Sequence, residues 1–190
     1  MATLMPPTYN LNKEGRNTKV DQNLYLGMIG SLLYLTTSRP VILYSVCFCI
    51  RFHSNLREAL LIVVKKIFRY LKGTKNLGLL YKKSIDYKLF GFYDVDYVRD
   101  KIERKSTSRN CQFIGKNLIS WASKRQPTIS LSIAQAEHFS DAKCSTQLLW
   151  MKYQLEDYQI CGSSIPIFRY NTATICLTKI PVQHSKTNHI

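Results

Sequence analysis

Apolar residues recur at helical spacing through the first third of the chain. One helical face is predicted from four apolar residues spaced three or four apart: Leu24, Met28, Leu32 and Leu35. The string Ser38-Arg39-Pro40 then predicts a break, because proline disfavours helix at the residue before it and suits the first turn of the next helix. We therefore expect a second helix from Pro40 to about His53.

A third helix is predicted from its end signals as well as its period. Asn55 and Glu58 have the spacing of an N-cap and its reciprocal acid, and Gly73 stands where a left-handed C-terminal cap is expected. The apolar face would consist of Leu60, Val64, Ile67 and Leu71. The opposite face carries Lys65, Arg69 and Lys72. This basic stripe fits contact with a phosphate backbone, and it equally fits an ordinary solvated helix face.

Beyond Gly73 the period changes from helical to strand-like. Short apolar and aromatic runs predict strands at 79–81, 87–93, 111–114, 118–121 and 165–168. Gly115-Lys116-Asn117 predicts a hairpin turn between two of them. Ser132 and Gln135 have capping-box spacing for a long helix that continues to about Tyr158, and a short helix is expected at 171–177. This order predicts an α/β fold, a mixed sheet with helices packed on it, preceded by a helical segment.

Charge adds a class of partner to this picture. The formal net charge is +15, and residues 1–83 hold 13 Lys and Arg against 3 Asp and Glu. A polyanion such as nucleic acid is the natural partner of such a field, although a basic protein with no nucleic-acid role has the same composition.

The six cysteines include no C-x-x-C pair, so the sequence predicts neither a zinc knuckle nor a disulfide framework. Cys47 and Cys49 lie in an apolar run and are expected to be small buried residues. We expect free thiols, no disulfide-linked partner and a reducing compartment, cytoplasmic or nuclear. No secretory signal is visible, and the apolar run at 41–50 is too short to span a bilayer, so no membrane role is expected.

Seven short strings, in order and spacing, carry a resemblance to a known family. They are MIGSLLYL (28–35), SRP (38–40), FRYLKGT (68–74), GFYDVDY (91–97), RKSTS (104–108), ISWASK (119–124) and LLWMK (148–152). Together they resemble the C-terminal part of a copia-type retrotransposon Pol polyprotein, most similar to plant elements. The polar composition of residues 1–20, with Pro6-Pro7 and few aliphatic residues, predicts a flexible lead-in. The resemblance implies a helical reverse transcriptase tail at 21–75 and a C-terminally truncated ribonuclease H-like domain at 76–190.

The implied activity is metal-dependent cleavage of RNA in an RNA–DNA hybrid. Two metal ions, usually Mg²⁺, activate water and stabilise the leaving oxygen, so several carboxylates must converge. The resemblance maps the first aspartate to Asp94 and the glutamate to Glu137, which makes both the expected catalytic and metal-binding residues. The alternatives are that Asp94 and Asp96 mark a turn and that Glu137 is an ordinary exposed helix residue.

The third acidic position of the family falls on Tyr170, in Tyr170-Asn171-Thr172. A phenol is neutral at pH 7 and cannot replace a hard anionic ligand. The fourth ligand would follow His189-Ile190, where the sequence stops. Arg99 and Arg109 stand where the family favours small residues. The pattern is that of a degenerate element whose ancestral cofactor is Mg²⁺.

Three hypotheses follow from these residues. The first is an endonuclease with no or very weak remaining activity. The second is a non-catalytic module that binds nucleic acid, a hybrid or another polyanion, through seven basic residues: Lys65, Arg69, Lys72, Arg104, Lys105, Lys124 and Arg125. The third is a retroelement remnant with no function, which nothing in the sequence excludes.

Overall fold

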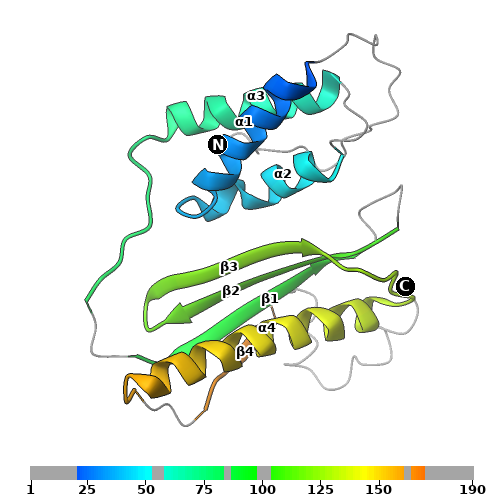
Figure 1. Cartoon of the computed structure of the whole chain (residues 1–190). Coiled ribbons are helices and arrows are strands. Elements are labelled where there is room, and N and C mark those ends of the chain that lie inside the picture. The colour runs from blue at the N-terminus through cyan, green and yellow to red at the C-terminus, as the bar shows by residue number, and fades with distance from the viewer. Residues whose placement is uncertain (1–20, 53–57, 84–86, 98–103, 161–163, 170–190) are drawn as a thin grey trace, which may run out of the picture. The chain divides into compact units, whose positions relative to one another are not determined.

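A computed structural model describes residues 21–52, 58–83, 87–97, 104–160 and 164–169. The chain divides into two compact units, Met1–Leu79 and Leu80–Ile190, drawn in Figure 1. Each unit has its own cluster of buried apolar side chains. The expected lead-in at 1–20 and the short helix at 171–177 lie outside the described residues. Within the described residues, no helix combines the length and apolar character that a membrane span requires.

The first unit begins with helix α1, Gln22–Leu35, whose first turn is capped by Asp21. The Asp21 carboxylate accepts hydrogen bonds from the backbone N–H groups of Asn23 and Leu24. The buried face of α1 differs from the predicted one, because Leu24 is 62% exposed and Tyr25 is fully buried. The Tyr25 hydroxyl donates to the Cys49 carbonyl oxygen at 3.0 Å, which satisfies the one polar atom of the ring inside the core.

Helix α2, Pro40–Arg51, starts at the proline as predicted. Cys49 is fully buried, as expected, whereas Cys47 is only half-buried. The described cysteines, Cys47, Cys49, Cys111 and Cys144, are free thiols.

Helix α3, Glu58–Gly73, buries Leu60, Val63, Val64 and Ile67 against α1 and α2. The predicted cap at Asn55 lies outside the described residues. The left-handed cap expected at Gly73 is wrong, because Gly73 remains in the helix and has no positive φ. The end of α3 is capped instead by Thr74, whose hydroxyl donates a hydrogen bond to the Tyr70 carbonyl oxygen at 2.8 Å. Arg39 adds two hydrogen bonds, to the carbonyl oxygens of Thr74 and Lys75.

The second unit contains a four-stranded mixed sheet in the order β3-β2-β1-β4. Its strands are β1 Leu89–Asp96, β2 Thr107–Ile114, β3 Asn117–Arg125 and β4 Ile167–Arg169. The β1–β2 and β2–β3 pairs are antiparallel, and β4 pairs parallel to β1. The hairpin turn predicted between β2 and β3 is present, and Gly115 adopts the positive φ of 56° that such a turn needs. The strand predicted at 79–81 is wrong, because those residues are not paired in the sheet.

Helix α4, Ile133–Asp157, lies along one face of this sheet (Figure 1). The predicted cap is confirmed, since the Ser132 side chain accepts from the Gln135 backbone N–H and the Gln135 side chain accepts from the Leu131 N–H. Cys144, Leu148 and Met151 on α4 pack with Leu89 and Tyr93 on β1. The predicted fold class is therefore confirmed: a mixed sheet with a flanking helix, preceded by a helical segment, consistent with a ribonuclease H-like fold.

Candidate functional site

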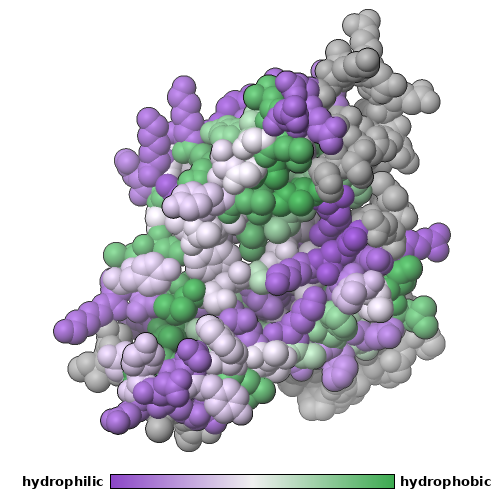
Figure 2. Space-filling view, in the orientation of Figure 1, coloured by the Kyte–Doolittle hydropathy of each residue, from purple (hydrophilic) through white to green (hydrophobic). Residues whose placement is uncertain are grey.

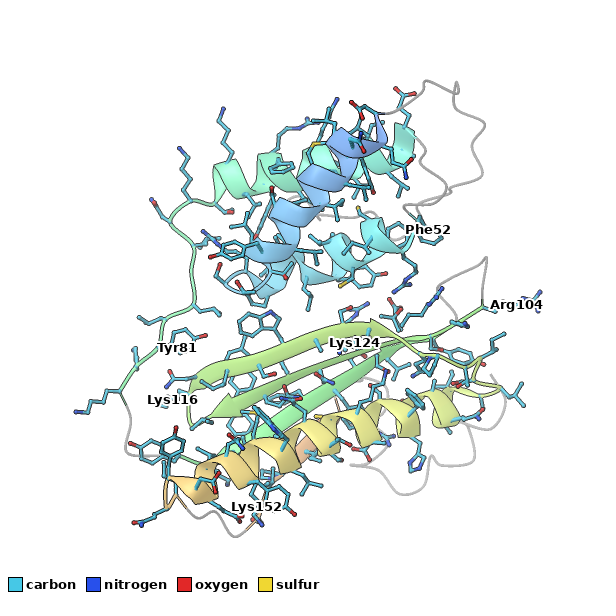
Figure 3. All side chains as sticks on the ribbon, in the orientation of Figure 1. Phe52, Tyr81, Arg104, Lys116, Lys124 and Lys152 are labelled. Carbon is cyan, nitrogen blue, oxygen red and sulfur yellow. The ribbon has the colours of Figure 1, made fainter. Side chains whose placement is uncertain are left out.

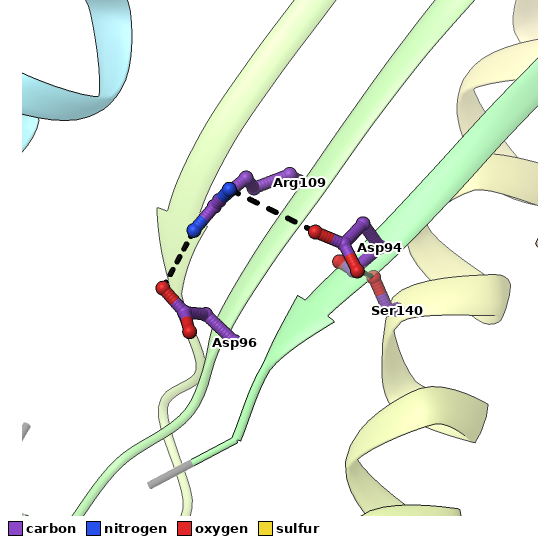
Figure 4. A network of polar contacts seen from close by, with 4 residues as sticks. All are labelled: Asp94, Asp96, Arg109 and Ser140. Carbon is purple, nitrogen blue, oxygen red and sulfur yellow. Dashed lines mark hydrogen bonds and ion pairs between the residues drawn. The ribbon is translucent and has the colours of Figure 1, made fainter. Parts of the chain in front are cut away.

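Asp94 lies near the end of β1, the strand between β2 and β4. Its partner directly across the antiparallel pair is Arg109 on β2. The Arg109 guanidinium reaches both acidic residues of β1, with Nη1 3.8 Å from Asp94 Oδ2 and Nη2 2.5 Å from Asp96 Oδ2 (Figure 4). Asp94 and Asp96 therefore share one positively charged partner.

The alternation of β1 sets the direction of the Asp94 side chain. Gly91 faces Cys144 and Leu148 on α4, so Tyr93, two residues on, lies on the same face. Phe92 and Asp94 then lie on the opposite face, where an open hollow of about 460 Å³ is lined by Phe92, Asp94, Arg109, Cys111 and Phe113 among others. The link from Asp94 to α4 is through its backbone, whose carbonyl oxygen accepts from the Ser140 hydroxyl at 3.3 Å.

Glu137 lies at the start of the second turn of α4 and is bound by Arg169, the last residue of β4. Arg169 Nη1 lies 3.0 Å from Glu137 Oε2, and Arg169 Nε donates to the Tyr93 hydroxyl at 2.8 Å. Tyr93 and Arg169 are register partners in the parallel β1–β4 pair. One arginine thus joins a residue of the central strand to a residue of the helix.

These contacts shift the ionisation of the groups involved. Burial raises the pKa of Tyr93, and the hydrogen bond and charge of Arg169 act in the opposite direction. Partial burial works to lower the pKa of Arg169, but the hydrogen bond to Tyr93 and the charge of Glu137 outweigh it, so the pKa is raised. The guanidinium is accordingly held in its charged form beside Glu137.

The donor set around these carboxylates does not match a magnesium site. Mg²⁺ requires several oxygen ligands in near-octahedral geometry at about 2.0–2.1 Å. Among the residues that the structure describes, no group of three or more His, Cys, Asp or Glu side chains is placed to hold a metal ion. Tyr170, predicted to stand at the third acidic position, lies outside the described residues. The assignment of Asp94 and Glu137 as metal ligands stays a prediction.

The predicted nucleic-acid-binding residues fall in both units. Lys65, Arg69 and Lys72 are exposed on α3, in the first unit, and hydrophilic side chains project from that unit in the space-filling view (Figure 2). The remaining four residues belong to the sheet unit: Arg104, Lys105, Lys124 and Arg125. Arg104 is exposed ahead of β2, and its side chain extends away from the ribbon (Figure 3).

Lys124 and Arg125 are neighbours on β3, opposite Ser108 and Thr107 of β2, so their side chains point to opposite faces of the sheet. Lys124 is exposed, and Arg125 is half-buried. On α4, burial and then the charge of Lys124 lower the pKa of Lys143, which identifies Lys143 as a basic neighbour of Lys124. The α4 side of the sheet therefore carries a pair of lysines, of which only Lys124 was predicted.

Sequence reasoning missed Arg169 and Lys143 and did not foresee what Arg109 binds. The pairing of Arg109 with Asp94 follows from the strand register, which the sequence does not state. The available signal was only the sign of the charge, because an arginine and two aspartates can form a cross-strand pair once their segments are known to be paired strands. No comparable local signal pointed to Arg169 or Lys143.

Comparison with known proteins finds relatives over the whole chain. The chain is 34% identical over 191 residues to the retrovirus-related Pol polyprotein from transposon RE1 of Arabidopsis thaliana, an alignment that covers 100% of this chain and 13% of the relative. It is 30% identical over 187 residues to the Pol polyprotein from transposon TNT 1-94 of Nicotiana tabacum, covering 98% of this chain and 14% of the relative. Its homologues over the whole chain are retrovirus-related Pol polyproteins of plant copia-type transposons.

The Pol homologues are much longer than this chain, which spans about 13% of their length. An uncharacterised mitochondrial protein of Arabidopsis thaliana is also similar, 36% identical over 152 residues that cover 79% of this chain and 62% of that protein. No family model matches the chain. No solved structure matches it either.

Proposed function

We propose that this chain is the ribonuclease H-like part of a Pol-derived protein and that it binds the backbone of an RNA–DNA hybrid without cleaving it. The observation that carries the proposal is the sheet order β3-β2-β1-β4, with Asp94 on the central strand and Glu137 on the flanking helix, in a chain whose homologues are Pol polyproteins. The net charge of +15 supports a polyanionic partner.

Contact with the sugar–phosphate backbone suits the basic residues that the structure describes. Hybrids and other A-form-like helices are recognised by their shape, phosphates and 2′-hydroxyl groups more than by base sequence. Lys124 and Lys143 supply two ammonium groups on the α4 side of the sheet, near enough for the charge of Lys124 to contribute to the lowered pKa of Lys143. Lys65, Arg69 and Lys72 supply an exposed stripe on α3. Affinity from such contacts falls steeply with salt, because phosphate binding releases counterions.

Cleavage is the competing function, and the retention of Asp94 and Glu137 favours it. Tyr170 argues against it, because a neutral phenol at a ligand position cannot help to hold Mg²⁺. Removal of charge stabilisation at an active site typically reduces the rate by about 10²–10³-fold for one group. We therefore expect binding without turnover.

The test is fluorescence anisotropy with a labelled hybrid, and with a DNA duplex of the same sequence, across a series of salt concentrations. We expect the affinity for the hybrid to fall linearly in log–log form as salt rises. Lys124→Gln combined with Lys143→Gln should reduce the slope by about 0.9 for each phosphate that the variant no longer neutralises. Lys116→Gln, which removes an exposed lysine at the β2–β3 turn, is the matched control and should leave the slope unchanged.

Absence of binding at low salt, or affinity that ignores salt, would overturn the binding proposal. Cleavage is followed separately, by gel separation of the labelled RNA strand after incubation with Mg²⁺. A ladder of shorter RNA products that EDTA suppresses would show that the chain is still a nuclease.

A further inference from the structure

Each of the two strands that flank β1 carries an arginine that contacts a carboxylate predicted to bind metal. Arg109 comes from β2, on one side, and binds Asp94 and Asp96. Arg169 comes from β4, on the other side, and binds Glu137. Each arginine is held in register with the β1 residue beside it, Arg109 with Asp94 and Arg169 with Tyr93. The positive charges are therefore placed by the sheet itself.

The carboxylates concerned are partly withdrawn from water, and each lies beside a guanidinium. The side chain of Asp96 is 19% exposed and that of Glu137 is 12% exposed. Two neighbouring carboxylates repel each other, and a carboxylate removed from water without a partner is destabilising. In a metal-dependent site the metal ion supplies the compensating charge. Here a guanidinium supplies it, with the planar set of donors that suits carboxylate oxygens.

The arginines also occupy one oxygen atom each of two of these carboxylates. Asp96 Oδ2 and Glu137 Oε2 each lie within hydrogen-bonding distance of a guanidinium nitrogen. A bound Mg²⁺ would place a second positive charge close to Arg109 or Arg169, and like charges at such distances repel. Metal binding would have to displace an arginine that strand pairing holds in place.

We propose that Arg109 takes the place of a divalent cation at Asp94 and Asp96 on one face of the sheet, and that Arg169 does so at Glu137 on the α4 face, so that the folded domain neither needs nor retains a metal ion at either position. The proposal depends on the proposed function only for the identification of Asp94 and Glu137 as metal positions. It is a property of the protein alone. Failure of the chain to bind a hybrid would therefore leave it standing.

The first test measures the thermal unfolding of the protein alone, with EDTA and with increasing MnCl₂ or MgCl₂. We expect the melting temperature of the wild type to be the same in EDTA and in either metal. Arg109→Ser should lower it, moderately because the Arg109 and Asp94 side chains are 35% and 32% exposed. Mn²⁺ should then recover part of that loss in a saturable manner, because ligand binding to the folded state stabilises it. Arg104→Ser, which removes an exposed arginine, is the control and should stay insensitive to Mn²⁺.

A second pair of variants separates charge from packing. Arg109→Ser combined with Asp94→Asn and Asp96→Asn should fold without any cation and should not respond to Mn²⁺. Arg109→Lys should also stay insensitive, because it retains one positive charge. Saturable stabilisation of the wild type by Mn²⁺ would overturn the proposal. So would an Arg109→Ser protein that Mn²⁺ does not stabilise or help to refold, or a neutral triple variant that fails to fold.

Discussion

Gly91 on β1 faces Leu148 on α4 so closely that a β-carbon on Gly91 would lie 2.9 Å from Leu148 Cδ1. The same β-carbon would lie 3.0 Å from the Cys144 sulfur. Both distances are shorter than ordinary van der Waals contact, so α4 rests on the sheet at the one β1 residue that has no side chain to keep it away. This contact sets the position of the helix that carries Glu137.

Gly91→Ala is expected to reduce the free energy of unfolding by about 1–3 kcal/mol, the usual cost of an extra methyl group in a packed core. Urea denaturation followed by circular dichroism measures the change. Gly30→Ala in α1 is the matched control, because a β-carbon there meets nothing within 4 Å. That control should be neutral or stabilising by up to about 1 kcal/mol. A Gly91→Ala protein as stable as the wild type would show that α4 does not pack on β1 in this way.

Gln126 holds the start of α4 to the sheet through a buried set of hydrogen bonds. Its side-chain nitrogen donates to Ser108 Oγ at 3.0 Å and to the Ala136 carbonyl oxygen at 2.8 Å. Its side-chain oxygen accepts from the Ser130 hydroxyl at 2.9 Å. These bonds fix the residue immediately before Glu137.

Gln126→Leu is expected to cost about 3 kcal/mol or more, because a buried polar atom that loses its partner costs about 1–3 kcal/mol and three partners are affected. Ser130→Ala removes a single bond and should cost about 1 kcal/mol. Chemical denaturation of both variants provides the comparison. Equal and small losses would mean that water replaces the Gln126 side chain without penalty.

Arg39 joins the start of α2 to the end of α3 by donating to the carbonyl oxygens of Thr74 and Lys75, each at 3.1 Å. Arg39→Met keeps much of the aliphatic stem but removes both donors. We expect a loss of about 1–2 kcal/mol from the two hydrogen bonds. Hydrogen exchange should show the last turn of α3 opening more readily than in the wild type. Unchanged exchange at Tyr70 to Gly73 would contradict this role.

Local signals in the sequence were sufficient for the helices and for the class of the sheet. Pro40 starts α2, and Ser132 with Gln135 caps α4, because these effects act within a few residues. The predicted cap at Gly73 failed because Arg39, distant in sequence, stabilises that helix end together with Thr74. The polar start of β2, from Thr107 to Asn110, was not predicted as strand. Its pairing with β1 on one side and β3 on the other makes it a strand, and this pairing is not visible in the local sequence.

The sequence predicted which elements carry the individual site residues, but not which residues they contact. The motif string places Asp94 on a strand and the capping box places Glu137 on a helix, and the structure has both there. Their arginine partners depend on register and on a parallel pairing across 76 residues from Tyr93 to Arg169. Such non-local geometry leaves no periodic trace in the sequence.

Cys49 makes the free energy of unfolding of the helical unit depend on pH in the alkaline range. The thiol is fully buried, and burial raises its pKa from about 9 to about 12, although the Tyr25 hydroxyl acts in the opposite direction. In the unfolded chain the thiol ionises near pH 9, while in the folded chain it stays protonated until about pH 12. The folded state thus binds more protons between these values, and the free energy of unfolding falls as pH rises through this window.

One such group contributes a slope of at most about 1.4 kcal/mol per pH unit. Denaturation at a series of pH values above 9 should show the fall, and Cys49→Ala should reduce its slope. The hydrogen bond from Tyr25 survives in that variant, because its acceptor is the backbone carbonyl oxygen of residue 49. If Cys49→Ala leaves the slope unchanged, other groups cause the loss of stability at alkaline pH. The buried Tyr25, whose pKa is also raised, is then the next group to test.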